Sequence, residues 1–291
     1  MGTQNFSDRN CIEDRRYQKF YAGQVAHAYG FTPCVVKVNN RMFFEHEKEV
    51  EFLLKYKHEN IIALLGYCNE DQGIIVYENV SKGRLSKYLM DMDPSITWMK
   101  RLKISIGVAK GCAFLHTSGV EMHGIEDIGL VINSILLDGD WNAKICPYSQ
   151  SLLDEHPYDD AYNKLEYFRL YLSKRQGIIY SLGVILLKML GGRPRHRWDS
   201  DPNVNIDNKM LFPGTKEPIS QQSVITFENI AMRCLQEATE ASEVVRQLEK
   251  ALEFQVSFHN FLQKVTNHQD LNVIIIFRGV LNKKYHTITD C

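Results

Sequence analysis

Apolar and polar residues alternate along this chain in a way that predicts strands early and helices later. Residues 33–38 are apolar and β-branched, which predicts a central strand. Two short apolar runs, 135–137 and 143–145, flank the turn dipeptide Asp138-Gly139 and predict a β-hairpin. Strands and helices are therefore both expected, largely in separate parts of the chain.

Apolar residues at helical spacing predict five helices. They span residues 43–57, 97–116, 177–190, 227–235 and 241–254. In the first helix, Phe44, Val50, Leu53 and Leu54 are predicted to fall on one side. The third is apolar almost all round and is expected inside the protein. Residues 195–222 are polar and predict a long loop.

Composition places the chain among ordinary globular proteins. Of its 291 residues, 44% are hydrophobic and 24% are charged. The net charge is −1, so no excess of positive charge favours binding to nucleic acid or to an anionic membrane. The seven cysteines are odd in number and lack a Cys-x-x-Cys pair, which favours free thiols and a cytoplasmic setting. No apolar run is long enough to cross a bilayer, and no metal-binding cluster of Cys and His is present.

Several segments resemble plant receptor-like protein kinases. Residues 135–145 read Ile-Leu-Leu-Asp-x-x-Trp-x-Ala-Lys-Ile, and residues 57–68 and 180–187 match the same family. The resemblance covers residues 3–255 and implies an α+β, two-lobed fold. It places a β-rich N-lobe with one helix at residues 1–78, a mainly helical C-lobe at 79–255 and an unassigned tail at 256–291.

Part of the family's nucleotide site is retained. The resemblance implies that Lys37 is the phosphate-contacting lysine and that Glu49 is its ion-pair partner. Tyr77 falls at the gatekeeper position, and Glu78 and Asn79 fall in the hinge whose backbone binds adenine. ATP is the cofactor that these five positions imply, although an ion pair of this kind can also serve only to hold a helix against a sheet.

The glycine-rich loop of the family is not retained. In register, its three glycines are replaced by Glu13, Arg15 and Gln18, whose side chains hinder close approach of backbone to phosphate. A plain β-hairpin is the favoured interpretation. The alternative is that Arg15 or Arg16 contacts a phosphate directly.

The catalytic and metal-binding motifs also depart from the family. The His-Arg-Asp triplet falls on residues 127–129, which read Asp-Ile-Gly, and Ser134 replaces the metal-binding asparagine. A shifted alignment would make Asp127 the catalytic aspartate and Asn133 the metal ligand. Pro147 replaces the metal-binding aspartate, and because proline has no carboxylate we assign no metal ligand and expect no Mg²⁺ site.

Two further family positions differ in the C-lobe. Ile178 replaces an aspartate that braces the catalytic loop, and the Arg-Pro-Thr segment before the last helix is missing, with the arginine that would pair with Glu166. Residues 150–166 correspond to the activation segment, and their hydroxyls and acidic run are interpreted as a solvated loop in preference to a phosphorylation site.

Three functions remain open at this point. The favoured one is a catalytically impaired pseudokinase that acts as a signalling interaction module with an active receptor-like kinase. It would be cytoplasmic and would reach the plasma membrane through that partner. The alternative is a divergent ATP-dependent Ser/Thr kinase that uses Lys37, Glu49, Asp127 and Asn133 in a rearranged site. A third is a decaying gene copy, whose C-lobe would be weakened by the loss at Ile178.

Overall fold

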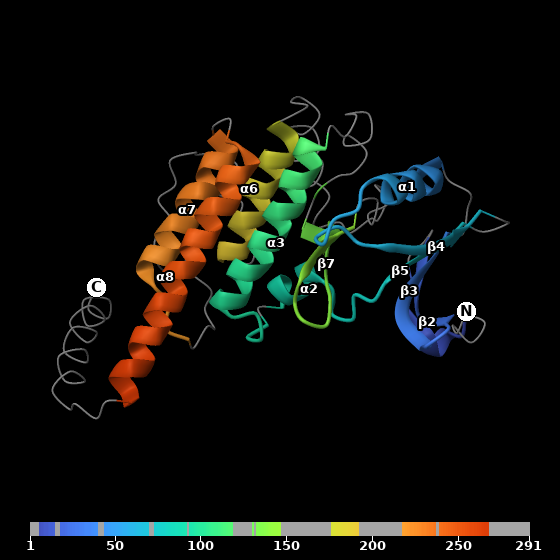
Figure 1. The fold of residues 1–291 in the computed structure, drawn as a ribbon, viewed down its shortest axis with the longest axis horizontal. Helices are drawn as coiled ribbons and strands as arrows, with labels where there is room; N and C mark the ends of the chain where they lie inside the picture. Colours follow the sequence, from blue (N-terminus) through green and yellow to red (C-terminus); the bar gives the residue numbers. More distant parts are fainter. Residues whose placement is uncertain are drawn as a thin grey trace.

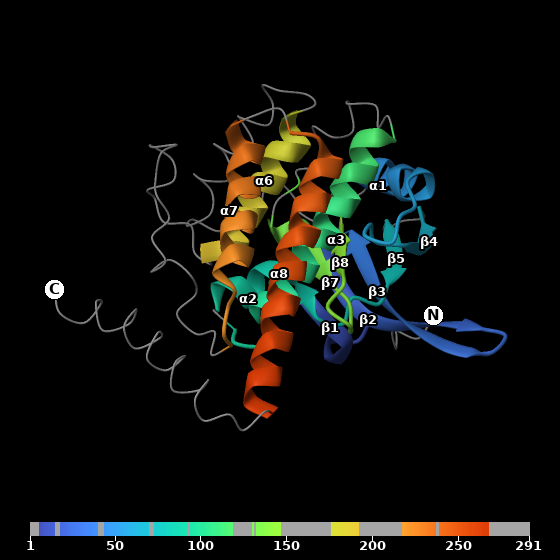
Figure 2. The ribbon, with the colours of Figure 1, turned by 60° about the vertical axis from the view of Figure 1, so that its left-hand side comes forward.

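The N-terminal lobe is a five-stranded antiparallel sheet. The computed structural model describes residues 6–14, 18–39, 44–69, 73–91, 93–118, 130, 132–146, 176–191, 217–236 and 239–267. After the short 3₁₀ helix η1 (Asp8–Asn10), the strands are β1 (Cys11–Asp14), β2 (Gln18–His27), β3 (Gly30–Asn39), β4 (Leu64–Cys68) and β5 (Ile74–Glu78). Their order, β1-β2-β3-β5-β4, confirms that β3 is central (Figure 1). The β2–β3 hairpin reaches beyond the rest of the sheet (Figure 2).

One helix, α1 (Phe44–Lys55), lies beside this sheet (Figure 1). Val50 and Leu53 are buried and join the main hydrophobic cluster of the protein. The prediction for Leu54 was wrong, because its side chain is 49% exposed. Consecutive helical residues are turned by about 100°, so Leu54 points outward when Leu53 points into the core.

A small three-stranded sheet lies where the two lobes meet. It consists of β6 (Gly83–Arg84), β7 (Ile135–Leu137) and β8 (Ala143–Ile145), all antiparallel, with η2 (Ile132–Ser134) just before β7. The β7–β8 pairing confirms the predicted hairpin. In its turn, Asp138 Oδ1 accepts bonds from the backbone N–H groups of Asp140 and Asn142, both at 2.9 Å, which fixes the reversal of the chain.

The C-terminal lobe is helical. Its helices in the described residues are α2 (Leu85–Met90), α3 (Trp98–Thr117), α6 (Gln176–Gly191), α7 (Gln221–Gln236) and α8 (Ala241–Asn267). The last four pack side by side (Figure 1). As its uniform apolarity predicts, α6 is buried along most of its length, including Leu182, Ile185 and Leu186.

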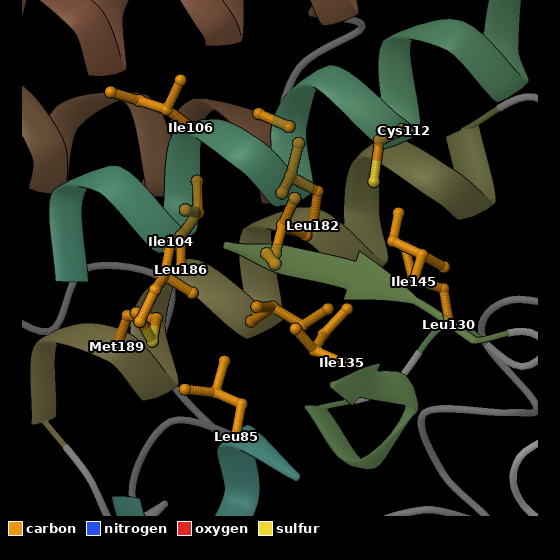
Figure 3. Close-up of a cluster of buried hydrophobic side chains, with 14 of the residues drawn as sticks. Leu85, Ile104, Ile106, Cys112, Leu130, Ile135, Ile145, Leu182, Leu186 and Met189 are labelled. Carbon is orange, nitrogen blue, oxygen red and sulfur yellow. The ribbon is translucent and has the colours of Figure 1, made fainter. Parts of the chain in front are cut away.

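The core of the C-lobe continues into the small sheet. Ile135 of β7 and Ile145 of β8 belong to the same buried cluster as Leu182 and Leu186 of α6 (Figure 3). Each of these four side chains is at most 1% exposed. The hairpin is therefore held in place by its packing against the helices.

Two helices differ in extent from the sequence prediction. Helix α7 begins at Gln221, six residues before the predicted start at 227, because the Ser220 hydroxyl accepts a bond from the Ser223 N–H and caps the first turn. The polar residues that suggested a loop thus form the start of a helix. Helix α8 continues from the predicted end at 254 to Asn267, because its spacing of apolar residues persists.

The architecture confirms the α+β, two-lobed fold. A β-rich N-lobe with one helix is joined through the small sheet to a mainly helical C-lobe (Figure 1). Within the described part of the chain, no helix combines the length and the apolar character that a membrane crossing requires.

Candidate functional site: a buried ion pair beside the hinge

Lys37 and Glu49 meet inside the N-lobe. Along β3 the side chains alternate between the two faces, so Val36 and Val38 join an outer cluster while Lys37 points to the other face. There Lys37 Nζ lies 2.6 Å from Glu49 Oε2 of α1. The two side chains are 2% and 1% exposed. The sequence prediction that these residues form a pair is therefore confirmed.

Tyr77 of β5 completes this buried group. Its hydroxyl donates to Glu49 Oε1 at 2.5 Å, so each oxygen of the carboxylate has a partner. Burial, and next the adjacent Glu49 carboxylate, raise the pKa of Tyr77 well above its usual value, which keeps the hydroxyl protonated as a donor. One glutamate of α1 thus binds two strands of the sheet through side chains alone.

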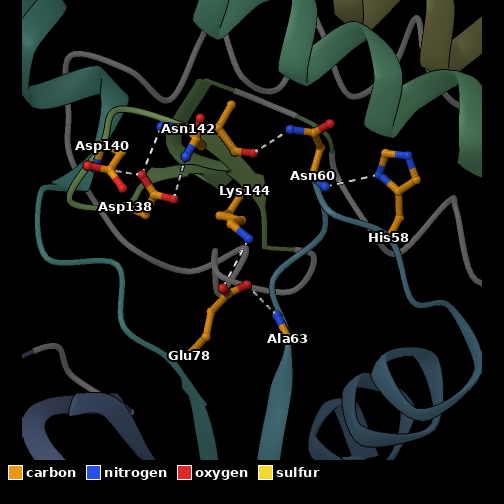
Figure 4. Close-up of polar contacts among 9 residues, drawn as sticks. His58, Asn60, Ala63, Glu78, Asp138, Asp140, Asn142 and Lys144 are labelled. Carbon is orange, nitrogen blue, oxygen red and sulfur yellow. Dashed lines mark hydrogen bonds and ion pairs between the residues drawn. The ribbon is translucent and has the colours of Figure 1, made fainter. Parts of the chain in front are cut away.

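The hinge residue Glu78 contacts both sheets (Figure 4). Its Oε1 accepts a bond from the Ala63 N–H at 2.8 Å, and its Oε2 lies 3.0 Å from Lys144 Nζ of β8. The backbone N–H of Glu78 also donates to the Ala63 carbonyl at 3.0 Å. Asn79, the next hinge residue, is exposed. Lys144 was not predicted as a site residue from the sequence, where its only signal was its central place in the Ala-Lys-Ile strand.

The loop between α1 and β4 is bonded to the β7–β8 hairpin (Figure 4). Asn60 Nδ2 donates to the Ala143 carbonyl at 3.0 Å, and the Ile62 N–H donates to the Ile145 carbonyl at 3.0 Å. His58 Nδ1 accepts from the Asn60 N–H, and burial lowers the pKa of this histidine, so the ring stays neutral and able to accept. The contacts with the hairpin were not predicted, because Asn60 and Ala143, for example, are 83 positions apart in the sequence.

The substituted glycine positions are only partly within the described residues. Glu13 Oε2 accepts a bond from Arg84 Nε at 3.3 Å, which ties β1 to β6. Gln18 is 6% exposed, and its Oε1 is buried without a hydrogen-bond partner. β1 and β2 form the expected antiparallel hairpin. Arg15 and Arg16, the alternative phosphate contacts, lie outside the described residues.

The catalytic positions lie mostly outside the described residues. These are Asp127, Pro147 and Glu166. Asn133 belongs to η2, but its side chain is not described. Ser134, at the position of the family's metal-binding asparagine, is 1% exposed, and its carbonyl accepts the Cys146 N–H at 2.8 Å. Among the described side chains, no three His, Cys, Asp or Glu residues gather as metal ligands.

Ile178 is accommodated by the C-lobe. Its side chain is 5% exposed and belongs to the main hydrophobic cluster. The position that the family fills with a bracing aspartate therefore contributes to the core here. A buried apolar residue at this point packs the start of α6 but offers no acceptor to a loop.

Comparison with known proteins agrees with this geometry. Residues 17–167 match the family model for protein tyrosine and serine/threonine kinases. The receptor-like protein kinase ANXUR1 of Arabidopsis thaliana is 29% identical over 87% of this chain and 33% of its own length. FERONIA, from the same plant, is 27% identical over 94% of this chain and 34% of its own length. HERK 1 is 31% identical over 66% of this chain and 24% of its own length.

The chain spans about a third of the length of the curated relatives that it matches. The family match covers more than half of the chain and includes Lys37, Glu49 and the hinge. This chain therefore belongs to the protein tyrosine and serine/threonine kinase family, with plant receptor-like kinases as its relatives.

Proposed function

We propose that this chain is a kinase-fold interaction module that does not transfer phosphate. The observation that carries the proposal is Pro147, two residues after β8. In the family's register this position holds the aspartate that binds metal, and phosphoryl transfer depends on metal ions to neutralise charge. The residues present do not fit Mg²⁺, because the register supplies neither this carboxylate nor the asparagine replaced by Ser134.

The expected loss of rate is large. Removing a general base typically costs about 10²- to 10⁴-fold. Losing the metal removes several kcal/mol of charge stabilisation, on the order of a further 10³-fold at about 1.4 kcal/mol per decade. Against turnover of roughly 1–100 per second for active kinases, the remaining rate is negligible.

The retained ion pair is consistent with a structural role. The Lys37 ammonium is bonded to Glu49 and is 2% exposed, and Tyr77 occupies the second carboxylate oxygen. A pair this buried holds α1 against the sheet whether or not nucleotide binds. We therefore propose that the group Lys37, Glu49 and Tyr77 preserves the shape of the N-lobe as a surface for partners.

The partner that we propose is an active receptor-like kinase. The relatives that match most of this chain carry that description. The six described cysteines are free thiols, which suits a cytoplasmic location, and recruitment to the plasma membrane would come through the partner. We retain the division into an N-lobe at 1–78, a C-lobe at 79–255 and a further segment at 256–291 as part of this proposal.

A divergent kinase is the second candidate, because the Lys37–Glu49 pair has the geometry that active kinases require. A phosphotransfer assay with radiolabelled ATP, Mg²⁺ or Mn²⁺ and myelin basic protein separates the two. We expect the same background incorporation for the full chain, Lys37→Met and Asp127→Asn. Incorporation by the full chain that both substitutions abolish would establish the divergent kinase instead.

A further inference from the structure

The β2–β3 hairpin leaves the N-lobe sheet as a two-stranded ribbon (Figure 2). The two strands pair along their whole length, up to the turn where His27 lies opposite Gly30. β1 accompanies β2 only as far as Tyr21, and β5 accompanies β3 only from Cys34 onward. Among the described strands, residues 22–33 therefore have no neighbour on either side. Two strands alone are only marginally stable in water, so a further strand beside this ribbon would stabilise it.

The backbone of β2 directs a row of polar groups away from the hairpin. The N–H of Asn39 donates to the Gly73 carbonyl at 2.9 Å, so at this position β3 directs its groups away from β2. The direction alternates along a strand, which places Pro33 in the same set, and proline has no N–H that β2 would need. The residues of β2 directly opposite this set also face outward. Beyond Tyr21 they are Ala22, Gln24 and Ala26, all of them exposed.

The two edges of the ribbon differ in how well they are protected. On the β3 side, Pro33 removes a donor that an added strand would use, which is a common protection of sheet edges. The β2 side has no proline, and no Asp, Glu, Lys or Arg occurs from Phe20 to Val36. Charged side chains on an edge strand normally prevent pairing with another chain. Residues 22–26 of β2, which we call the ribbon edge, are therefore open to a further strand.

A second copy of the hairpin fits the ribbon edge poorly. Antiparallel pairing of two copies about Gln24 would place His27 of one copy opposite Tyr21 of the other. That position is already taken, because Cys11 of β1 pairs with Tyr21. The occupant that fits is an extended segment whose chain leaves the sheet before it reaches β1.

The side chains beside the ribbon edge indicate which segment fits. Ala22 and Ala26 project to the same face as Phe31, which lies opposite Ala26 and is 69% exposed. Because the two alanines are small, an added strand can place large apolar side chains over them and against the Phe31 ring. A charged segment would lose hydration without gaining an ion pair, since the ribbon carries no opposite charge.

We propose that the ribbon edge binds an extended, uncharged segment of a partner protein as an added antiparallel strand. Backbone bonds to Ala22, Gln24 and Ala26 hold the segment, and its alternate Val, Ile or Phe side chains pack on the face that carries Phe31. The inference deepens the proposed function, on which it rests, by naming a surface of the interaction module and the chemistry of its partner.

Fluorescence anisotropy with backbone-modified peptides tests the proposal. The probe is a labelled peptide Gly-Val-Thr-Phe-Thr-Val-Gly on a polyethylene glycol linker. In antiparallel pairing, the residues whose side chains share the Ala22 face are also those whose amides face β2. N-methylation of the Val and Phe amides should therefore abolish binding to the full chain, whereas N-methylation of the Thr amides should leave it intact. Because no charges meet, the affinity should not fall as salt rises.

Variants locate the binding at the ribbon edge. Gln24→Pro removes an outward N–H and none of the bonds between β2 and β3, so it should weaken binding by about tenfold or more while the hairpin stays folded. The matched control Gln24→Thr keeps the N–H and should leave the affinity unchanged. Phe31→Ser removes the exposed ring and should also weaken binding. Circular dichroism and urea midpoints check that each variant folds.

Other results would overturn the proposal. These are no binding of the unmodified peptide, equal binding of the two N-methylated peptides, or an unchanged affinity of Gln24→Pro. If deletion of residues 1–5 raises the affinity, the chain's own N-terminal residues are the occupant in place of a partner. If light scattering shows a dimer that Gln24→Pro dissociates, a second copy is. The phosphotransfer assay on the same preparations reports separately on catalytic inactivity.

Discussion

At the scale of single residues, Glu49 is the centre of the N-lobe. Its carboxylate binds the Lys37 ammonium at 2.6 Å and the Tyr77 hydroxyl at 2.5 Å, and the glutamate itself is 0% exposed. A buried charge is tolerated only when it is paired and hydrogen-bonded. The three side chains therefore depend on one another, because removing Glu49 would deprive both Lys37 and Tyr77 of their shared buried partner.

We predict that Glu49→Ala destabilises the fold by about 3–5 kcal/mol, because it leaves the Lys37 ammonium buried and unpaired. Tyr77→Phe removes one hydrogen bond to a charged group and should cost only about 1.5–3 kcal/mol. Urea denaturation followed by fluorescence measures both free energies of unfolding. Equal stability of Glu49→Ala and the unchanged chain would mean that the pair does not hold α1 in place.

Contacts between individual residues were predictable from the sequence only where a local motif indicated them. The family register paired Lys37 with Glu49 and assigned Tyr77 to the gatekeeper position. It did not reveal that the Tyr77 hydroxyl takes the second Glu49 oxygen. It also missed the Glu78–Lys144 ion pair, because a pair 66 positions apart has no periodic signal.

At the scale of elements, helices α6 and α7 pack unusually closely at Gly183. A Cβ atom on Gly183 would lie 2.8 Å from Cys234 Cβ and 3.2 Å from the Ala231 carbonyl oxygen. Both atoms are fixed to the backbone of α7, so neither can move aside without shifting the helix. The absent side chain at Gly183 therefore sets the distance between the two helices.

We predict that Gly183→Ala destabilises the C-lobe by about 1–3 kcal/mol through overpacking. Gly191→Ala is the matched control at the end of the same helix, because a Cβ atom on Gly191 would have no neighbouring atom within 4 Å. Thermal unfolding by calorimetry compares the two variants. Because alanine favours a helix more than glycine does, Gly191→Ala should not lower the melting temperature. If Gly183→Ala does not lower it either, close packing at Gly183 does not set the distance between the helices.

The turn of the β7–β8 hairpin gives a pH prediction. Burial alone would raise the pKa of Asp138, but bonds from the Asn142 side chain and from the Asn142 and Asp140 N–H groups bring it below its ordinary value of 3.8. The folded state then binds fewer protons than the unfolded state as pH falls through this range. The stability that Asp138 contributes is fully present above about pH 4 and is lost below it.

We therefore expect Asp138→Asn to flatten the loss of stability as the pH falls below about 4. Urea midpoints across this range, for the full chain and the variant, make the comparison. Asp140→Asn, which changes an exposed neighbour in the same turn, should leave the acid dependence intact. A variant curve parallel to that of the full chain would show that Asp138 contributes nothing through its pKa.

Elements were predicted well in type and less well in extent. The strand at 33–38 and the hairpin at 135–145 were found because their apolar runs are short and bounded by turns. The start of α7 was not predicted, because the polar residues Gln221 and Gln222 gave no apolar periodicity, although Ser220 caps the helix before them. Leu54 was placed on the wrong side of its helix, because consecutive helical residues are turned by about 100° and Leu53 takes the inward position.

At the scale of the whole molecule, the two lobes are joined by a compact set of polar contacts. Glu78 binds both Ala63 and Lys144, and Asn60 binds the Ala143 carbonyl. The small sheet also packs against the hydrophobic core of the helical lobe. Ile178, at the position where the family resemblance implies a bracing aspartate, is part of that core.

This protein keeps the kinase fold, and we infer that it has lost metal-dependent nucleotide chemistry. A thermal-shift titration with ATP, with and without Mg²⁺, measures whether nucleotide binding depends on the metal. The full chain is compared with Lys37→Met, and each protein is referred to its own ligand-free melting temperature. Ligand at 100 times its dissociation constant stabilises by about 2.7 kcal/mol, or several degrees for a domain of this size. We expect Mg²⁺ to add no shift beyond that of ATP alone. A shift that requires Mg²⁺ and disappears in Lys37→Met would contradict it.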